Sequence, residues 1–107
     1  MNKRIKKKMG LSKIQDSECF DLDLKIINFV LPRLKKFKKV NVNSYPEECG
    51  SIEDWHKIIN KIIWSFQFAL DVKERNYSNE YRSNKENWDR YNEGMDLFRD
   101  YLLNLWD

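Results

Sequence analysis

The feature that most constrains this fold is a set of apolar rows that repeat at steps of three and four residues along the 107-residue chain. Such spacing places side chains on one face of an α-helix, because the helix turns once every 3.6 residues. The first row is Leu24, Ile27, Val30, Leu31, Leu34 and Phe37, the second is Ile52, Trp55, Ile59, Ile62, Ile63, Phe66 and Leu70, and the third is Trp88, Tyr91, Met95, Phe98, Leu102 and Leu105. The sequence therefore predicts an all-α protein, a compact bundle of three to four helices.

Composition supports this prediction and excludes several other classes of protein. Apolar residues make up 41% of the chain, and only three glycines and two prolines are present, which is too few for a turn-rich β-sandwich. No apolar run approaches the roughly 18 residues that cross a membrane, and the basic first residues lack the apolar segment of a secretion signal. We therefore expect a soluble, cytosolic protein that has no membrane partner.

Two regions are expected along the chain. Residues 1–19 have no sustained apolar period and predict a flexible basic arm, with a short helical turn near residues 11–14. Residues 20–107 are expected to form a single helical domain, because two independent cores would need roughly 100 residues each. Within this domain, turn-forming residues at positions 41–50 predict a loop between the first and second helices.

Helix boundaries can be placed from capping residues. Asp21 or Asp23 can cap the first helix, and Ser51 stands where the N-cap of the second helix is expected. Pro32 lacks an amide proton, so we expect either a kink in the first helix or a break, with Pro32 opening a second short helix. Gly94 lies inside the third helix and costs about 1 kcal/mol relative to alanine, unless a neighbouring backbone packs closely against it.

Charge is distributed unevenly along the sequence. Residues 1–46 hold twelve Lys and Arg against four Asp and Glu, whereas residues 47–107 hold eight against thirteen, so the two parts carry +8 and −5. The basic part can bind phosphates or acidic protein surfaces, or it can match the acidic part within the molecule. The last helix carries five carboxylates at helical spacing, which predict a solvated face or a strip that imitates a nucleic-acid backbone: Glu86, Asp89, Glu93, Asp96 and Asp100.

The residues that usually perform catalysis are scarce. His56 is the single histidine, and the chain has neither a glycine-flanked serine elbow nor a glycine-rich phosphate loop. We therefore expect a protein that is not an enzyme and needs no cofactor. Cys19 and Cys49 are expected to be free thiols that bind no metal, with a zinc site built from Cys19, Cys49 and His56 as the weaker alternative, because thiolate and imidazole are the ligands that zinc prefers.

Aromatic and cationic residues provide the candidate binding residues. Aromatic rings can stack on a base or fill a pocket in a partner, while an arginine holds a phosphate or a carboxylate. Trp64 lies at the edge of the second apolar row and is expected to be partly exposed. The candidate contact residues are Arg33, Lys36, Lys39, Tyr45, Trp64, Tyr77 and Arg82.

Several motifs together resemble a family of small proteins that recur in genomes of tailed bacteriophages. They are Leu22-Asp23, the stretch Phe-Val-Leu-Pro-Arg-Leu-Lys-Lys-Phe-Lys at 29–38, Tyr45-Pro46, Trp55 with Ile-Ile-Trp-Ser-Phe at 62–66, Glu-Gly-Met-Asp-Leu-Phe at 93–98, Tyr101, and Leu-Trp-Asp at 105–107. The likeness spans roughly residues 20–107, and the sequence departs from the pattern at Ser44, Ile62 and Gln67. It implies a phage origin and therefore a place in the host cytoplasm.

The resemblance also sets an order of functional hypotheses. Small phage proteins without catalytic motifs generally act by stoichiometric binding, so the leading hypothesis is an accessory protein that binds and inhibits a host component, with antiviral defence as the expected class. The second is a module that sequesters a nucleotide-type signal between the protomers of a homo-oligomer. The third is a nucleic-acid-binding protein that uses the basic arm and the helix around Arg33.

Overall fold

The computed structural model describes residues 10–74 and 79–106, and these residues form helices and contain no strand. The α-helices are α2 (Leu22–Val40), α3 (Ile52–Glu74), α4 (Asn79–Ser83) and α5 (Lys85–Tyr101), and the 3-10 turns are η1 (Leu11–Lys13), η2 (Asp16–Cys19), η3 (Glu47–Cys49) and η4 (Leu102–Asn104). Among these described residues, the all-α prediction and the expected three to four helices are confirmed.

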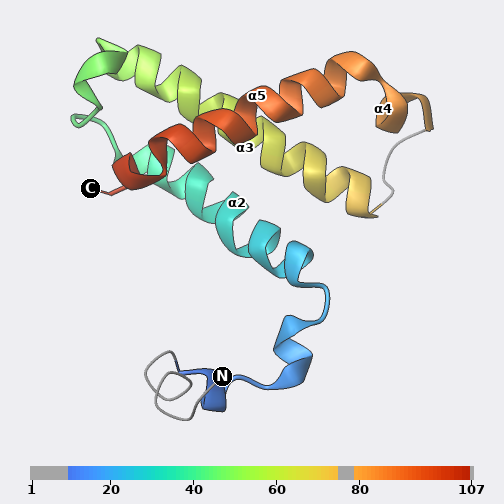
Figure 1. The fold of residues 1–107 in the computed structure, drawn as a ribbon. Helices are drawn as coiled ribbons and strands as arrows, with labels where there is room; N and C mark the ends of the chain where they lie inside the picture. Colours follow the sequence, from blue (N-terminus) through green and yellow to red (C-terminus); the bar gives the residue numbers. More distant parts are fainter. Residues whose placement is uncertain (1–9, 75–78, 107) are drawn as a thin grey trace.

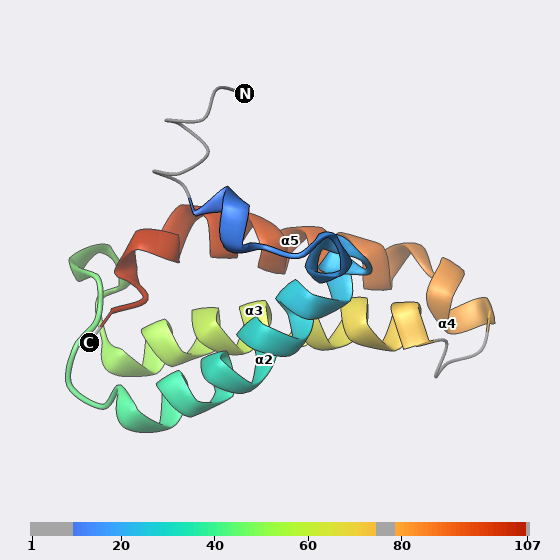
Figure 2. The same ribbon diagram turned by 90° about the horizontal axis from the view of Figure 1, so that it is seen from below.

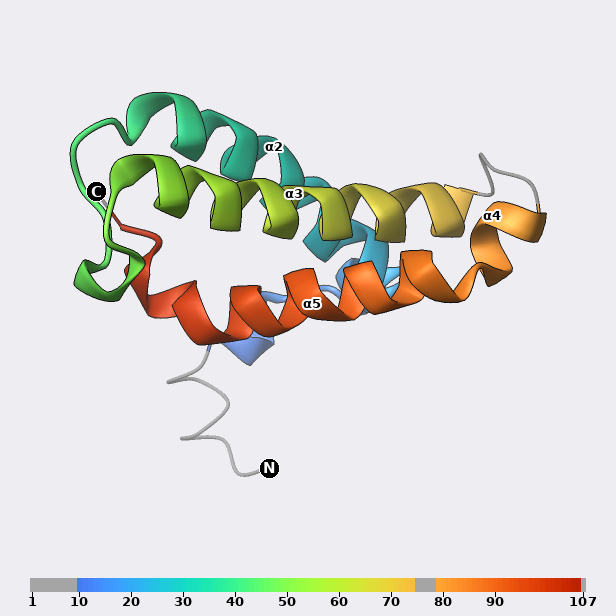
Figure 3. The same cartoon turned by 90° about the horizontal axis from the view of Figure 1, so that it is seen from above.

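Helix α3 occupies the middle of the bundle. It packs against α2 on one side and against α5 on the other (Figures 1 and 3). The core contains Ile27, Leu31 and Leu34 from α2 together with Ile62 and Phe66 from α3. The ring of Phe98 in α5 meets the ring of Phe66 edge-on, and the two ring centroids are 5.0 Å apart. The apolar rows of the sequence therefore supply the contacts that hold the three long helices together.

The ends of α2 and α3 follow two different capping patterns. The hydroxyl of Ser51 accepts a hydrogen bond from the amide of Asp54 at 3.1 Å, as expected for the N-cap of α3. Asp21 precedes α2 with a φ of 49°, and its side chain makes no capping hydrogen bond, so its expected role is wrong. Asp23 instead accepts from the amide of Leu24 and pairs at 2.7 Å with Lys73, an interaction that lowers the pKa of the Asp23 carboxyl. This ion pair ties the start of α2 to the end of α3.

Pro32 neither breaks α2 nor opens a new helix, so the break, one of the two expected alternatives, is wrong. The helix runs without interruption from Leu22 to Val40, with Pro32 inside it. Proline removes one amide donor and crowds the preceding turn. The carbonyl oxygen that loses its backbone donor is that of Asn28, four residues before Pro32. Both residues lie on the exposed surface of α2, where water can supply the missing hydrogen bond. The guanidinium of Arg33 donates to the adjacent carbonyl oxygen, that of Phe29, at 2.9 Å.

Residues 10–20 extend away from the bundle (Figure 1). They form the expected short turn, η1, and a second one, η2, and neither turn contains a buried residue. Lys25 donates to the carbonyl oxygen of Ser17 at 2.7 Å, and this hydrogen bond lies on the exposed surface. Residues 1–9 of the predicted arm lie outside the described residues.

Deletion of residues 1–13 is expected to leave the melting temperature nearly unchanged. The reason is that residues 10–13, the described part of this segment, contribute no buried side chain to the core. Thermal unfolding followed by circular dichroism, with the full-length chain as the reference, measures the effect. A fall of more than about 4 °C, which corresponds to roughly 1 kcal/mol in a domain of this size, would show that the arm stabilises the bundle.

The described residues of the polar stretch at 71–86 lie in or next to helices. Helix α3 continues to Glu74, and α4 and the start of α5 follow after residue 78. Asn84 caps α5, because its side chain accepts from the amide of Asn87 at 3.1 Å. Tyr81 is half-buried, and its ring centroid lies 5.6 Å from that of Phe68, whereas Tyr77 lies outside the described residues.

Candidate functional site

An apolar groove runs between α2 and the chain at the end of α5. Its volume is about 250 Å³. Helix α2 contributes five of the lining residues, and α5, η4 and the residue after η4 contribute one each: Phe29, Val30, Arg33, Leu34, Phe37, Phe98, Leu102 and Leu105. The chain after α5 ends near the C-terminal end of α2, which brings the two walls together (Figures 1 and 2). Seven of the eight lining residues are apolar, so the groove can accommodate apolar side chains of a ligand or partner.

Large apolar side chains are exposed around this groove. The exposed fraction is 60% for Phe29 and 50% for Leu102, both in its walls, and 88% for Leu103 and 70% for Trp106 beyond it. Single exposed apolar residues are common on protein surfaces, but Phe29 and Leu102 are exposed in the walls of one groove, an arrangement typical of an interaction site.

Positive charge follows the same stretch of α2. Arg33, Lys36 and Lys39 are exposed, and Arg33 also lines the groove. The guanidinium of Arg33 lies 3.8 Å from the centroid of the Phe29 ring while it donates to the carbonyl oxygen of that residue. Its position at the rim is therefore fixed by two contacts within α2. The structure thus places these three predicted contact residues along one stretch of α2, and Arg33 among them lines the apolar groove.

The other predicted contact residues lie elsewhere in the fold. Tyr45 is exposed and lines a small depression of about 60 Å³ between the 41–46 loop and the C-terminal chain. Trp64 is half-buried, its ring stacks on Phe68 at 5.2 Å, and the guanidinium of Arg90 lies 4.1 Å from its centroid. Arg82 is half-buried in α4, and its carbonyl oxygen accepts from the indole of Trp88 at 2.6 Å. Tyr77 falls outside the described residues, so the seven candidates do not form one site.

The structure does not bring together the three candidate ligands of the weaker zinc alternative. Cys19 is exposed in η2, whereas Cys49 is half-buried in η3, and the Nε2 atom of His56 lies 2.7 Å from the carbonyl oxygen of Asn41. Within the described residues, no group of three His, Cys, Asp or Glu side chains could hold a metal ion. Burial raises the pKa of the Cys49 thiol, which favours the protonated form over the thiolate that zinc would need.

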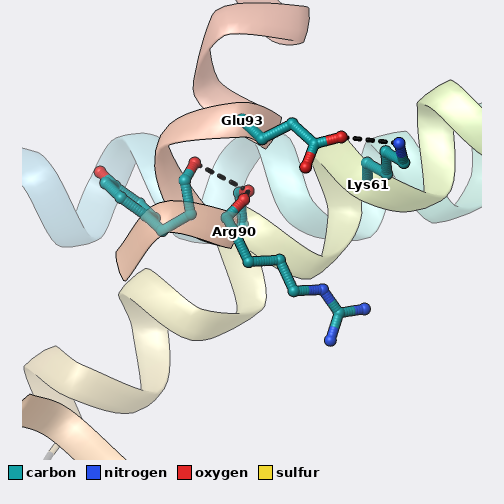
Figure 4. Close-up of polar contacts among 5 residues, drawn as sticks. Lys61, Arg90 and Glu93 are labelled. Atoms are coloured by element: carbon teal, nitrogen blue, oxygen red, sulfur yellow. Dashed lines mark hydrogen bonds and ion pairs between the residues drawn. The ribbon is translucent and has the colours of Figure 1, made fainter. Parts of the chain in front are cut away.

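The acidic strip on α5 is largely paired within the molecule. Glu93 binds Lys61 of α3 at 2.6 Å, and Asp89 binds Lys85 at 2.8 Å (Figure 4 shows the first pair). Arg99 forms ion pairs with the two carboxylates nearest the end of α5, those of Asp96 and Asp100. Four of the five predicted strip residues thus have a cationic neighbour from this chain. Their negative charge is partly neutralised, so the strip resembles a nucleic-acid backbone less than the sequence indicates.

The apolar part of the site was not identified from the sequence. The first apolar row was assigned to the core face of α2, and it omitted Leu22, Ile26 and Phe29, which the structure leaves at least half exposed. Their spacing of four and three residues is the available signal, because it defines a second apolar stripe beside the core stripe.

The comparisons with known proteins find no matching family model, no matching curated protein and no matching solved structure. None of the helices in the described part of the chain is both long and apolar enough to span a membrane. The surface of this protein therefore provides the basis for a functional proposal.

Proposed function

We propose that this chain is a phage-encoded accessory protein, without enzymatic activity, that binds a host protein stoichiometrically and inhibits it. The observation that carries the proposal is the apolar groove between α2 and the end of α5, with Phe29 and Leu102 exposed in its walls. Apolar anchors that fill such a groove supply most of the binding energy in protein complexes. The phage origin and the choice of antiviral defence proteins as the first targets rest on the family resemblance.

The chemistry of the groove indicates what the partner presents. Its apolar walls accept leucine, isoleucine, methionine or aromatic side chains, and the cations of Arg33 and Lys36 lie on the same helix. A partner segment with apolar anchors and flanking Asp or Glu side chains would satisfy both features, because complementary charge speeds association and selects the partner. An amphipathic acidic helix is the simplest segment of this kind.

The two other hypotheses have less support. A nucleotide-binding site would pair a free arginine with a free aromatic face, but Trp64 is already in contact with Phe68 and Arg90, and Arg33 lies against Phe29. A nucleic-acid site could use the cations of α2, but binding to phosphates alone would leave the apolar groove unexplained. The experiment that tests the proposal also has a distinct result for each of these two hypotheses.

The proposal can be tested by capturing partners from infected host cells on the immobilised full-length protein. Native mass spectrometry of the eluate is expected to show one host protein at a fixed ratio. Leu102→Glu should weaken its binding at least tenfold, about 1.4 kcal/mol, because the change places a carboxylate in an apolar groove. The matched control is Leu103→Glu, which makes the same change one residue later and outside the groove lining, and it should retain the partner.

Four outcomes contradict the proposal. Equal binding by the wild type and by Leu102→Glu would show that the groove is not the binding site. An added mass of a few hundred daltons, with no bound protein, would favour the nucleotide-sequestering module. Bound nucleic acid whose affinity falls steeply with salt would favour the third hypothesis. A captured protein whose own activity does not change when this chain is added would remove the inhibitory role.

A further inference from the structure

The chain itself contains a segment with the chemistry that the groove accepts. We call residues 14–20 the strap. It contains one apolar residue that is 46% exposed, Ile14, followed by two acidic residues, Asp16 and Glu18, and no cation lies between positions 14 and 20. Apolar walls and the cation of Arg33 at the groove would recognise such a combination. The strap is therefore complementary to the groove in both apolar character and charge.

The direction of the strap is that of the groove. In Figures 1 and 2, residues 10–20 turn back at the start of α2 and run toward the end of the bundle at which α2 and α5 finish. They are separated from the bundle, and neither η1 nor η2 contains a buried residue. The strap therefore does not have to reverse its direction in order to lie along α2.

One backbone conformation and one exposed hydrogen bond hold the strap in its place. Asp21, at the junction with α2, has a φ of 49° and a ψ of 43°, the left-handed conformation that residues other than glycine rarely adopt. The ammonium group of Lys25 donates to the carbonyl oxygen of Ser17 at 2.7 Å on the exposed surface, where water competes for both groups. A change of conformation at Asp21 would therefore move the strap without exposing any buried side chain of η2.

The length of the strap matches the distance to the groove. The four residues of η2 rise about 2 Å each, and the three remaining steps of about 3.3 Å give a span of about 18 Å from Asp21 to Ile14. Because α2 rises 1.5 Å per residue, about 18 Å from its start is the level of Leu34 in the groove. By the same measure Asp16 lies about 11 Å from Asp21, level with Phe29.

We propose that the strap closes over the groove of its own chain, with Ile14 between the apolar walls and the carboxylate of Asp16 on the guanidinium of Arg33. That guanidinium already lies at the level of Phe29, where it donates one hydrogen bond to the carbonyl oxygen. A guanidinium has five N–H donors, so others can bind a carboxylate. The short connection through Asp21 keeps strap and groove at a high effective concentration, which favours closure within one chain over the same contact between two chains. The structure shows the open arrangement.

Closure would regulate the binding of a host protein, and this consequence rests on the proposed function. The strap and the host segment would occupy the same groove, so the apparent Kd of the host protein increases as the open fraction falls. A strap that is closed half of the time would double that Kd. The closure itself needs no host partner, and it can be measured on this protein alone.

Nuclear magnetic resonance of the full-length protein tests the closed arrangement. Nuclear Overhauser effects are expected between the methyl groups of Ile14 and those of Leu102 or Leu105 in the groove. Ile14→Glu should shift the amide signals of the groove residues, because a carboxylate does not stay between apolar walls. The matched control is Ser12→Glu, which adds the same carboxylate at an exposed position outside the strap and should leave those signals unchanged.

Three results would overturn closure within one chain. The first is the absence of any effect between Ile14 and the groove. The second is a set of groove signals that Ile14→Glu leaves unchanged, or that Ser12→Glu shifts equally. The third is an effect seen only between differently labelled chains in a mixed sample, which would show that the strap binds a second copy instead.

A charge exchange tests the ion pair that positions the strap. Arg33→Glu should weaken the contact between Ile14 and the groove, because Asp16 would then face a carboxylate. Asp16→Arg combined with Arg33→Glu should restore the contact, since the two charges attract again. If the double variant shows no more contact than Arg33→Glu alone, Asp16 is not the partner of Arg33.

Capture from infected cells separates the strap from the proposed function. Ile14→Glu should retain more of the host protein than the wild type does, whereas Ser12→Glu should retain the same amount. If the strap closes but Ile14→Glu retains no more host protein, the strap does not compete for the groove and its regulatory role is wrong. If the strap does not close, the proposed function still stands or falls with Leu102→Glu.

Discussion

Replacement of Trp55 by alanine is expected to lower the free energy of unfolding by about 3–5 kcal/mol. The indole is 1% exposed near the start of α3, and its ring centroid lies 5.4 Å from that of Tyr101 at the end of α5. Removing it leaves a cavity where the ends of two helices meet. A domain of this size is stable by only about 5–15 kcal/mol, so a large part of its stability would be lost. Chemical denaturation monitored by circular dichroism measures the change.

Trp106→Ala is the matched control for this experiment. It removes the same side chain from a position that is 70% exposed, and the change should stay within about 0.5 kcal/mol. A loss below about 1 kcal/mol for Trp55→Ala, or equal losses for the two variants, would show that the assignment of Trp55 to the core is wrong. The comparison separates burial from the general effect of losing a tryptophan.

The helices could be predicted from the sequence because each apolar row repeats with the helical period. Ser51 also occupies its predicted N-cap, where its hydroxyl binds the amide of Asp54. Pro32 marks the limit of such reasoning, because the sequence pattern left both a kink and a break open. The amide donor that proline lacks would have bound the carbonyl oxygen of Asn28. Both residues lie on the exposed surface of α2, where water can replace that donor, and the helix is not broken.

The candidate site could be predicted only in its charged part. Arg33, Lys36 and Lys39 were identifiable because cations are expected to be exposed wherever the helix lies. Phe29 and Leu102 were assigned by default to the interior or left out, because an apolar residue on a helix normally faces the core. Whether a second apolar stripe is covered depends on where neighbouring helices lie. In this fold α3 covers one face of α2 and leaves Leu22, Ile26 and Phe29 exposed.

Gly94→Ala is expected to destabilise the protein by about 1–3 kcal/mol, although alanine favours a helix by about 1 kcal/mol over glycine. Gly94 is buried where α5 crosses α3. A Cβ atom there would overlap the hydroxyl oxygen of Ser65 and lie 2.5 Å from the carbonyl oxygen of Lys61. The Ser65 hydroxyl also donates to the carbonyl oxygen of Tyr91 at 3.0 Å, so it cannot turn away without losing that bond. Equilibrium denaturation in urea measures the effect.

The matched control is Asn92→Ala, which places alanine on the exposed face of the same helix and should be neutral or slightly stabilising. A second variant, Gly94→Ala with Ser65→Gly, removes the hydroxyl and the Cβ that the new methyl group would meet. It should recover only part of the loss, because the backbone carbonyl of Lys61 stays in place. If Gly94→Ala proved as stable as Asn92→Ala, the close approach of α3 and α5 would be wrong. The sign of this change therefore separates intrinsic helix preference, which favours alanine, from the helix packing that requires glycine.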